Sequence, residues 1–248
     1  MQQQMFDFAQ SHLVDSWDRL DRFVVGSNQV ALQLLTGWLD DARGQHAYLF
    51  GGKHSGCTRL LHASCRRVLE DGRIAAVIDS PRALLDGEQI ALLDRNHLLV
   101  LDNLDQLDSM NRSANSPTNQ CEAIEEALYE LFDRAQDQHC ALLFAAHAPI
   151  SELRILLPDL RTRLSSCLQI GLRPLDDYGL EQLAEQLLLE CGVSQVPPGL
   201  GRMVLTYCRR DSANVVSFIR KMQSASLYEK KPVNVPFVRK YLQQLDVL

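Results

Sequence analysis

The chain has 248 residues, enough for one large domain or for a large and a small one. Hydrophobic residues make up 46% of it and charged residues 23%, as in ordinary soluble globular proteins. The formal net charge of -6 argues against a broad nucleic-acid-binding surface, although a local basic patch is compatible with it.

Two further features narrow the class of protein. The sequence contains neither a secretory signal pattern nor an apolar stretch of about 18 residues, so we expect a cytoplasmic protein without a membrane span. The 7 cysteines are odd in number and never spaced Cys-x-x-Cys. This pattern predicts reduced, mostly buried thiols and no zinc site.

Residues 1–10 combine glutamines with large apolar side chains. Such a segment can bind as an extended peptide, with its apolar side chains in a hydrophobic pocket of a partner. The residues that would make this contact are Gln2, Gln3, Met5, Phe6 and Phe8. The alternative is that they fold back onto the core of the same chain. Further along, a turn at Val25-Gly26-Ser27-Asn28 precedes an amphipathic helix predicted over 30–39.

The most informative stretch runs from Tyr48 to Ala63. An apolar strand over 47–50 leads into a glycine-rich turn, and a helix is expected from about Thr58, the layout of a Gly-x-x-x-x-Gly-Lys-Ser/Thr phosphate-binding loop. Backbone N–H groups of such a turn and the helix N-terminus favour phosphate. The candidate contacts are Gly51, Gly52, Lys53, Ser55, Gly56, Cys57, Thr58 and Arg59.

The lysine position of this motif holds Cys57, and a thiol cannot supply the missing charge. A charge-assisted hydrogen bond contributes roughly 1.5–3 kcal/mol, so we expect weak phosphate binding and poor catalysis. Lys53 is a candidate substitute that reaches back over the loop. A turn that binds no ligand is the alternative interpretation.

After a helix over 60–69 come a strand over 74–79, a helix over 84–93 and a buried strand ending in Asp102. A carboxylate there can hold Mg²⁺ together with the Thr58 hydroxyl, or can simply end the strand. The next residue, Asn103, cannot act as a general base. We predict a mobile polar loop over 108–121, a helix over 122–135 and a strand over 140–146. His147, at the tip of that strand, could sense a phosphate or merely end the strand.

The segment 157–164 is rich in arginine and is expected to be a loop. Arg163 could act as an arginine finger on the nucleotide of a neighbouring subunit, or form a surface salt bridge. A strand over 167–172 then completes the sheet, and the remaining residues show helical patterns over 176–191, 197–208, 212–226 and from 235 onward. The predicted architecture is α/β, with a central parallel sheet in 11–172, a helical lid domain in 173–248 and a tail in 1–10.

The order of these pieces resembles the DnaA-related AAA+ family, and most closely its short regulatory members. Four segments carry the resemblance: Phe23-Val24-Val25-Gly26-Ser27-Asn28, Leu60-Leu61-His62-Ala63, Leu157-Pro158-Asp159-Leu160 with Arg163-Leu164, and Val235-Pro236-Phe237-Val238. It covers nearly all residues from about 12 to 248, and we expect no DNA-binding helix-turn-helix after the lid. The glutamine-bearing N-terminus is similar to a peptide that binds the DNA polymerase sliding clamp.

The resemblance implies a regulatory adaptor of replication initiation. It would bind the sliding clamp through its tail and DnaA through its AAA+ face, with Arg163 acting in trans on DnaA-bound ATP. ADP or ATP with Mg²⁺ would bind weakly or not at all, with Val25 among the contacts. Ala213 stands where the lid would present an arginine, with Arg209 and Arg210 just upstream.

Two other functions stay open at this level. The first is an active P-loop ATPase, such as a helicase loader or clamp-loader subunit, against which Cys57, Asn103 and Ala213 argue. The second is a DNA-binding module that uses the basic residues of the lid, against which the net charge argues; we expect DNA contact to be weak or indirect. A homo-oligomer is compatible with the sequence.

Overall fold

The computed structural model describes residues 19–41, 44–86, 93, 96–112 and 118–245. They form two compact units, of which the first includes Asn28–Leu172 and the second combines Val24–Ser27 with the helical segment from Arg173 onward. The clamp-binding segment predicted for residues 1–10 lies outside the described residues. Within the described residues, no helix is long and apolar enough to cross a membrane.

The first unit is a five-stranded parallel sheet with the strand order β2-β3-β4-β1-β5. The strands are β1 (His46–Gly51), β2 (Ala75–Ile78), β3 (Leu98–Leu101), β4 (Ala141–Ala146) and β5 (Leu168–Leu172). The α-helices are α2 (Gln29–Asp40), α3 (Cys57–Glu70), α4 (Gln106–Arg112), α5 (Thr118–Asp137) and α6 (Pro158–Ser166). Short 3₁₀ turns cover Leu20–Arg22, Pro81–Asp86 and Ile150–Glu152. The predicted α/β class with a central parallel sheet is confirmed.

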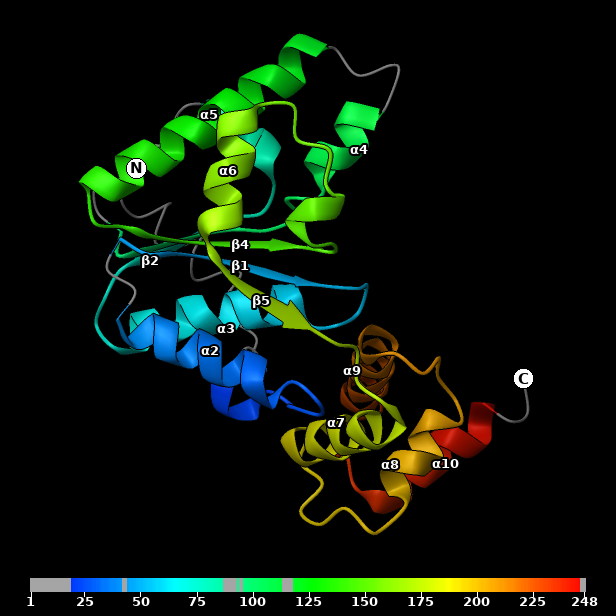
Figure 1. The fold of residues 1–248 in the computed structure, drawn as a ribbon. Coiled ribbons are helices and arrows are strands. Elements are labelled where there is room, and N and C mark those ends of the chain that lie inside the picture. The colour runs from blue at the N-terminus through cyan, green and yellow to red at the C-terminus, as the bar shows by residue number, and fades with distance from the viewer. Residues whose placement is uncertain (1–18, 42–43, 87–92, 94–95, 113–117, 246–248) are drawn as a thin grey trace. The chain divides into compact units, whose positions relative to one another are not determined.

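Both faces of the sheet are covered, with α5 and α6 on one side and α2 and α3 on the other (Figure 1). Successive side chains of a strand point to opposite faces. In β4, therefore, Phe144 belongs to the core under α5, whereas its neighbour Leu143 belongs to the core over α3. Burial on both faces explains why the central strands are uninterrupted apolar runs.

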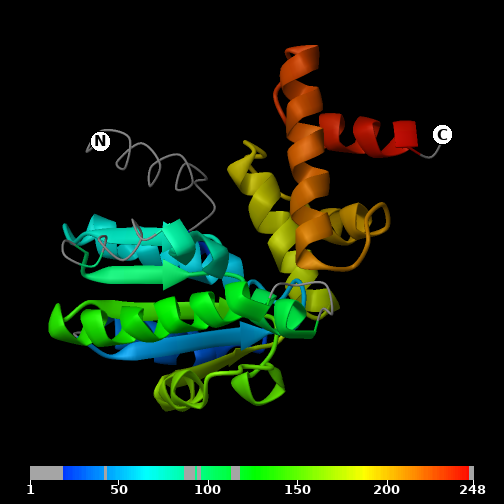
Figure 2. The same cartoon turned by 90° about the horizontal axis from the view of Figure 1, so that it is seen from above.

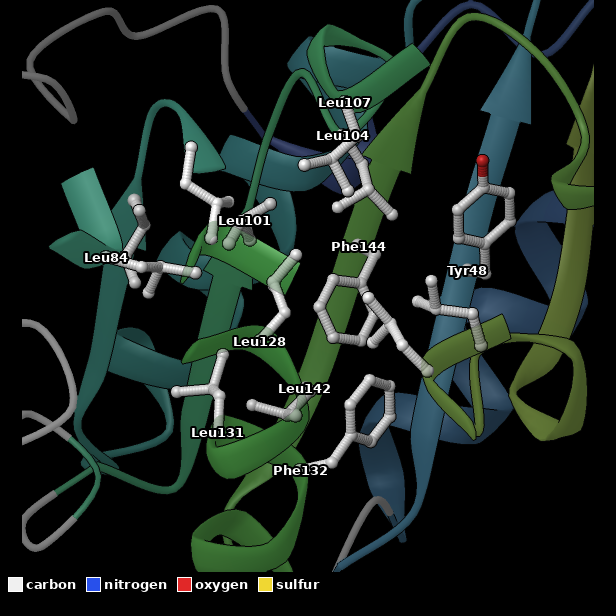
Figure 3. Packing of buried hydrophobic residues seen from close by; sticks show 14 of the residues in the cluster. Tyr48, Leu84, Leu101, Leu104, Leu107, Leu128, Leu131, Phe132, Leu142 and Phe144 are labelled. Carbon is white, nitrogen blue, oxygen red and sulfur yellow. The ribbon is translucent and has the colours of Figure 1, made fainter. Parts of the chain in front are cut away.

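Aromatic rings fill the core beneath α5. Phe132 of α5 stacks on Phe144 of β4 with 5.1 Å between the ring centroids (Figure 3). The His46 ring meets the same Phe132 ring edge-on, also at 5.1 Å. The Tyr48 hydroxyl, which would be costly to bury alone, donates a 2.7 Å hydrogen bond to the carbonyl of Ala148. The face of the helix predicted over 122–135 is confirmed, because Leu128 and Leu131 are fully buried in this core.

Three local predictions were wrong. The polar segment over 108–121 is not one loop, because α4 extends to Arg112 and α5 begins at Thr118; residues 113–117 lie outside the described residues. The segment over 157–164 is helical, since Pro158 can occupy the first helical turn without losing a hydrogen bond. The helix predicted over 84–93 is a 3₁₀ turn over Pro81–Asp86, and residues 87–92 are outside the described part.

The second unit consists of α7 (Asp177–Glu190), α8 (Leu200–Leu205), α9 (Ser212–Glu229) and α10 (Val235–Leu245). Asp176 caps α7 by accepting from the Gly179 N–H, and Asp211 caps α9 by accepting from the Asn214 N–H. The second lid helix is shorter than the predicted 197–208. Figure 2 shows that the C-terminal end of α9 extends past α7 and α8.

Glu125 is a buried carboxylate whose position in α5 fixes the segment leading into α6. It accepts hydrogen bonds from the backbone N–H groups of Leu156 and Leu157, the latter at 2.6 Å, and from the side-chain amide of Asn111. The amide of Asn111 also donates to the Arg154 carbonyl. The carboxylate thus anchors the two residues that lead into α6, whose own N-cap residue, Leu157, has no capping side chain.

We expect Glu125→Ala to lower the free energy of unfolding by about 2–4 kcal/mol, because it leaves buried N–H donors without an acceptor. Urea unfolding followed by circular dichroism measures this change. The matched control is Glu126→Ala, since Glu126 is the exposed neighbour on the same helix and should change stability by less than about 0.5 kcal/mol. Equal effects of the two substitutions would contradict the anchoring role of Glu125.

Candidate phosphate-binding loop and arginine

The turn between β1 and α3 has the strand-to-helix geometry predicted for a phosphate-binding loop. Gly56 adopts φ +97° and stands at the N-terminal end of α3, a conformation that favours glycine. Gly51 has no room for a side chain, because a Cβ there would lie 2.6 Å from Ser55 Oγ and 2.7 Å from the Leu172 carbonyl oxygen. The two glycines are therefore required by the tight path of the loop, and the first N–H groups of α3 lack intrahelical acceptors.

Cys57 occupies the lysine position as a buried, neutral thiol. Its Sγ lies 3.3 Å from Ser55 Oγ, and burial raises the pKa of the thiol to about 11. At neutral pH the side chain carries no charge, so the interior of the loop lacks both the usual cation and a reactive thiolate. The neighbouring Lys53 is exposed and has no ion-pair partner in the described part of the chain.

Asp102 and Thr58 meet at the carboxyl end of the sheet. Asp102 is 5% exposed, and burial raises the pKa of its carboxyl group, while a hydrogen bond from the Thr58 side chain opposes this rise. A second hydrogen bond, 2.7 Å long, comes from the backbone N–H of Asn103. The structure thus brings together the two residues that the sequence predicted as magnesium ligands. A hydroxyl and a carboxylate are oxygen donors of the kind that Mg²⁺ prefers.

The residue after Asp102 cannot activate water. Asn103 has φ +58°, and its side-chain amide donates a 2.9 Å hydrogen bond to the Asp79 carbonyl, which ties it to the end of β2. It serves the turn rather than a catalytic water.

Two histidines complete the surroundings of Asp102, and sequence reasoning gave a possible role to only one of them. His62 follows Thr58 by one helical turn, and its charge lowers the pKa of Asp102; its buried Nδ1 has no hydrogen-bond partner among the described residues. The i, i+4 spacing from Thr58 was a signal that could have found it. His147, the candidate phosphate sensor, is held by Asp105, whose Oδ1 lies 3.1 Å from both its backbone N and its Nδ1.

Two other predicted nucleotide contacts, Arg59 and Val25, do not lie with the residues of the phosphate-binding loop and Asp102. The Arg59 guanidinium donates to the carbonyl of Arg22 and lies over the Phe23 ring, 5.9 Å from its centroid. Val25 belongs to the second unit, where it lines a hollow of about 640 Å³. The hollow is bordered by Val24, Val25, Gly26, Ser27, Asp176, Tyr178, Gln182 and Gln186. In the same unit, Ala213 is exposed in the first turn of α9, and Arg210 pairs with Asp177.

Arg163 lies near the amino ends of the strands, whereas the loop lies at their carboxyl ends. It stands near the end of α6, just before β5, whose first residue Leu168 pairs with Ala47 near the start of β1. Burial and the charge of Arg163 lower the pKa of His46, the first residue of β1, to about 4, which places the guanidinium near that end of the strand. The loop begins at the other end of β1, roughly 17 Å away at 3.3 Å per residue.

Contacts within the chain hold the Arg163 side chain against α5. The guanidinium lies over the Tyr129 ring, 4.3 Å from its centroid, donates to the Tyr129 hydroxyl at 3.0 Å and pairs with Asp133. The surface salt bridge considered from the sequence therefore exists. The side chain keeps 29% of its surface exposed, and Asp133 keeps 50%, so neither is sealed inside the protein.

No family model matches the chain. Among solved structures, it is similar to domain III of the Thermotoga maritima replication initiation protein DnaA (TM-score 0.72, 16% identity, 93% of this chain and 97% of that one). A DnaA bound to AMPPCP and single-stranded DNA matches with a TM-score of 0.65 at 15% identity, over 88% and 69% of the two chains. A point mutant of Thermotoga maritima RuvB gives 0.62 at 18% identity, over 93% and 74%. The chain thus has the fold of DnaA domain III, as its resemblance to the DnaA-related AAA+ family predicted.

Proposed function

We propose that this chain is an Hda-like regulatory adaptor of replication initiation. It binds DnaA and promotes hydrolysis of DnaA-bound ATP by inserting Arg163 at the partner's nucleotide. The observation that carries the proposal is the separation of the two sites, because Arg163 and the phosphate-binding loop lie beyond opposite ends of β1. An arginine placed there cannot act on a nucleotide in its own loop.

The chemistry asked of Arg163 is compatible with its surroundings. Phosphoryl transfer needs positive charge at the equatorial oxygens, and a planar guanidinium supplies it without proton transfer. In the free chain the side chain pairs with Asp133 at a half-exposed site, and such pairs contribute only about 0–1 kcal/mol. A triphosphate carries more charge than one carboxylate, so docking on DnaA would draw the guanidinium from Asp133 to the phosphate.

The loop supports the proposal because it has the shape of a phosphate-binding turn but lacks the positive charge needed for hydrolysis. Thr58 and Asp102 would hold Mg²⁺, and the backbone of Gly51–Thr58 would surround the phosphates of ADP or ATP. A neutral Cys57 and an Asn103 committed to the turn fit weak binding without turnover. The nucleotide of this chain would then have a structural or regulatory use.

The tail adds the second contact of the proposal. Gln2, Gln3, Met5, Phe6 and Phe8 would bind the sliding clamp as an extended peptide. This places the chain at DNA through the clamp, where it could meet DnaA.

We predict that Arg163→Ala lowers the stimulation of DnaA ATP hydrolysis by about 10³-fold or more, the lower range for loss of an arginine finger. The assay follows phosphate release from ATP-loaded DnaA in the presence of the sliding clamp. Arg161→Ala is the matched control, since Arg161 lies two residues earlier on α6 and donates to the Leu153 carbonyl instead. Unchanged stimulation by the Arg163 variant, with its fold and clamp binding intact, would refute the mechanism.

Cys57→Lys should tighten binding of Mg²⁺-ADP by about 10- to 150-fold, because it restores the charge-assisted hydrogen bond to the phosphates. Titration calorimetry with ADP and ATP measures the affinity. Cys57→Met serves as the control of similar length without charge. If the lysine variant and the methionine variant bind equally, the turn is not a phosphate site.

Replacing Met5, Phe6 and Phe8 together by alanine should abolish retention on immobilised sliding clamp. The same variant should keep its thermal unfolding temperature, because the change falls in the tail. A variant that still binds the clamp would remove this part of the proposal and leave the role of Arg163 untouched.

A further inference from the structure

One stretch of the second unit is strongly basic. Residues 202–240 contain nine lysines and arginines but only two acidic residues, Asp211 and Glu229, whereas the whole chain has a formal net charge of -6. The net charge therefore conceals a basic region that covers α8, α9 and α10. Whether this region can bind an anion depends on which of its side chains face solvent together.

One face of α9 is exposed along its whole length and lacks acidic residues. Its members follow helical spacing and are Ala213, Ser217, Arg220, Lys221, Ser224, Leu227 and Tyr228. The opposite face packs into the unit through Val215, Ile219, Met222 and Ser226. We call the exposed set the α9 outer face. Lys230 follows directly, in the left-handed conformation that ends the helix.

Two lysines of this region, Lys221 and Lys230, are available to a ligand. Glu229, the last residue of α9, already pairs with Lys231 and Lys240. Within the described residues, Lys221 and Lys230 have no carboxylate partner and are exposed. Lys221 thus lies in the middle of α9 and Lys230 just past its C-terminal end, next to an outer face that carries no acidic residue.

Tyr228 gives the face its second property. It is 91% exposed and the adjacent Leu227 is 75% exposed, the two highest values among the large hydrophobic side chains of the described residues. Tyr228 is the seventh residue after Lys221, about two helical turns on, so both point to the same side of α9. Ser217 and Ser224 are small, so an extended strand could approach the helix closely between these larger side chains.

We propose that the α9 outer face binds single-stranded nucleic acid. Lys221 and Lys230 contact phosphates, and a base stacks on the ring of Tyr228. Exposed aromatic rings among cations are the usual platform for unpaired bases, since every base has a stacking face. A lipid surface is less well matched, because a membrane-binding helix needs a broad apolar face and this one has two apolar side chains at one end.

The test measures fluorescence anisotropy of a fluorescein-labelled oligothymidylate titrated with the full chain at several salt concentrations. Tyr228→Ser should lower the affinity at least about fivefold, whereas Tyr228→Phe should keep it within about twofold because the ring is retained. Lys221→Ala with Lys230→Ala should reduce the slope of log affinity against log salt by about 1.4, since each phosphate contact to a single strand contributes roughly 0.7. Arg202→Ala, an exposed arginine of α8 paired with Glu181, is the control of equal charge change per residue and should leave the slope nearly unchanged.

Circular dichroism of each variant confirms the fold before binding is compared. Affinity that does not change in Tyr228→Ser, or a preference for duplex over single strand, would overturn the assignment of the ring. A parallel arm uses vesicles that contain phosphatidylglycerol. Lysine-dependent binding to these vesicles without binding to the oligonucleotide would overturn the proposal in favour of a membrane. The outcome does not depend on Arg163, so this test and that of the proposed function fail separately.

Discussion

The proposed action of Arg163 on a partner's nucleotide depends on the parallel pairing of β1 with β4 and β5. In a parallel sheet the carboxyl ends of all strands lie on the same side. The loop after β1, Asp102 after β3 and His147 after β4 therefore lie close together there. The connection from α6 to β5 lies at the opposite, amino ends of the strands, and Arg163 lies near it. The candidate phosphate-binding loop and Arg163 therefore lie at opposite ends of the strands, and the proposed action on a neighbouring protein rests on this separation.

The loop has the shape of a phosphate-binding turn without the positive charge that usually accompanies it. Its backbone is set by Gly51 and Gly56, and the close contact between Gly51 and Ser55 does not involve the lysine position at all. A thiol at Cys57 packs in that place without disturbing the turn. The geometry of the loop and the charge at the lysine position are therefore separable, as the proposed action on another protein's nucleotide requires.

Sequence reasoning worked where local pattern decides the structure and failed where distant residues decide it. The strands of the sheet were recognisable because burial on both faces makes them apolar throughout, and the glycine loop because its spacing is local. The partners of Arg163 could not be recognised from the sequence, because Tyr129 and Asp133 stand about thirty residues away on α5. Nor did the polar pattern near residue 110 reveal α4, whose Asn111 is fixed by a contact with Glu125.

The distribution of charge was also only partly predictable from the sequence. A net value of -6 argued against nucleic-acid binding, yet the helical patterns of the lid contain the residues of a basic, acid-free face. The sequence carried this information in the spacing of Lys221, Leu227 and Tyr228, but the orientation of α9 was needed to separate its outer face from its buried one.

The central claim is that the nucleotide hydrolysed belongs to the partner. A single-turnover experiment tests it directly: DnaA is loaded with γ-labelled ATP, freed of excess nucleotide, and mixed with this chain, the sliding clamp and unlabelled ATP. We predict that labelled phosphate is released in step with loss of DnaA-bound ATP, while this chain with ATP alone releases none above background. Turnover of ATP by the isolated chain, with the label on DnaA left intact, would contradict the account.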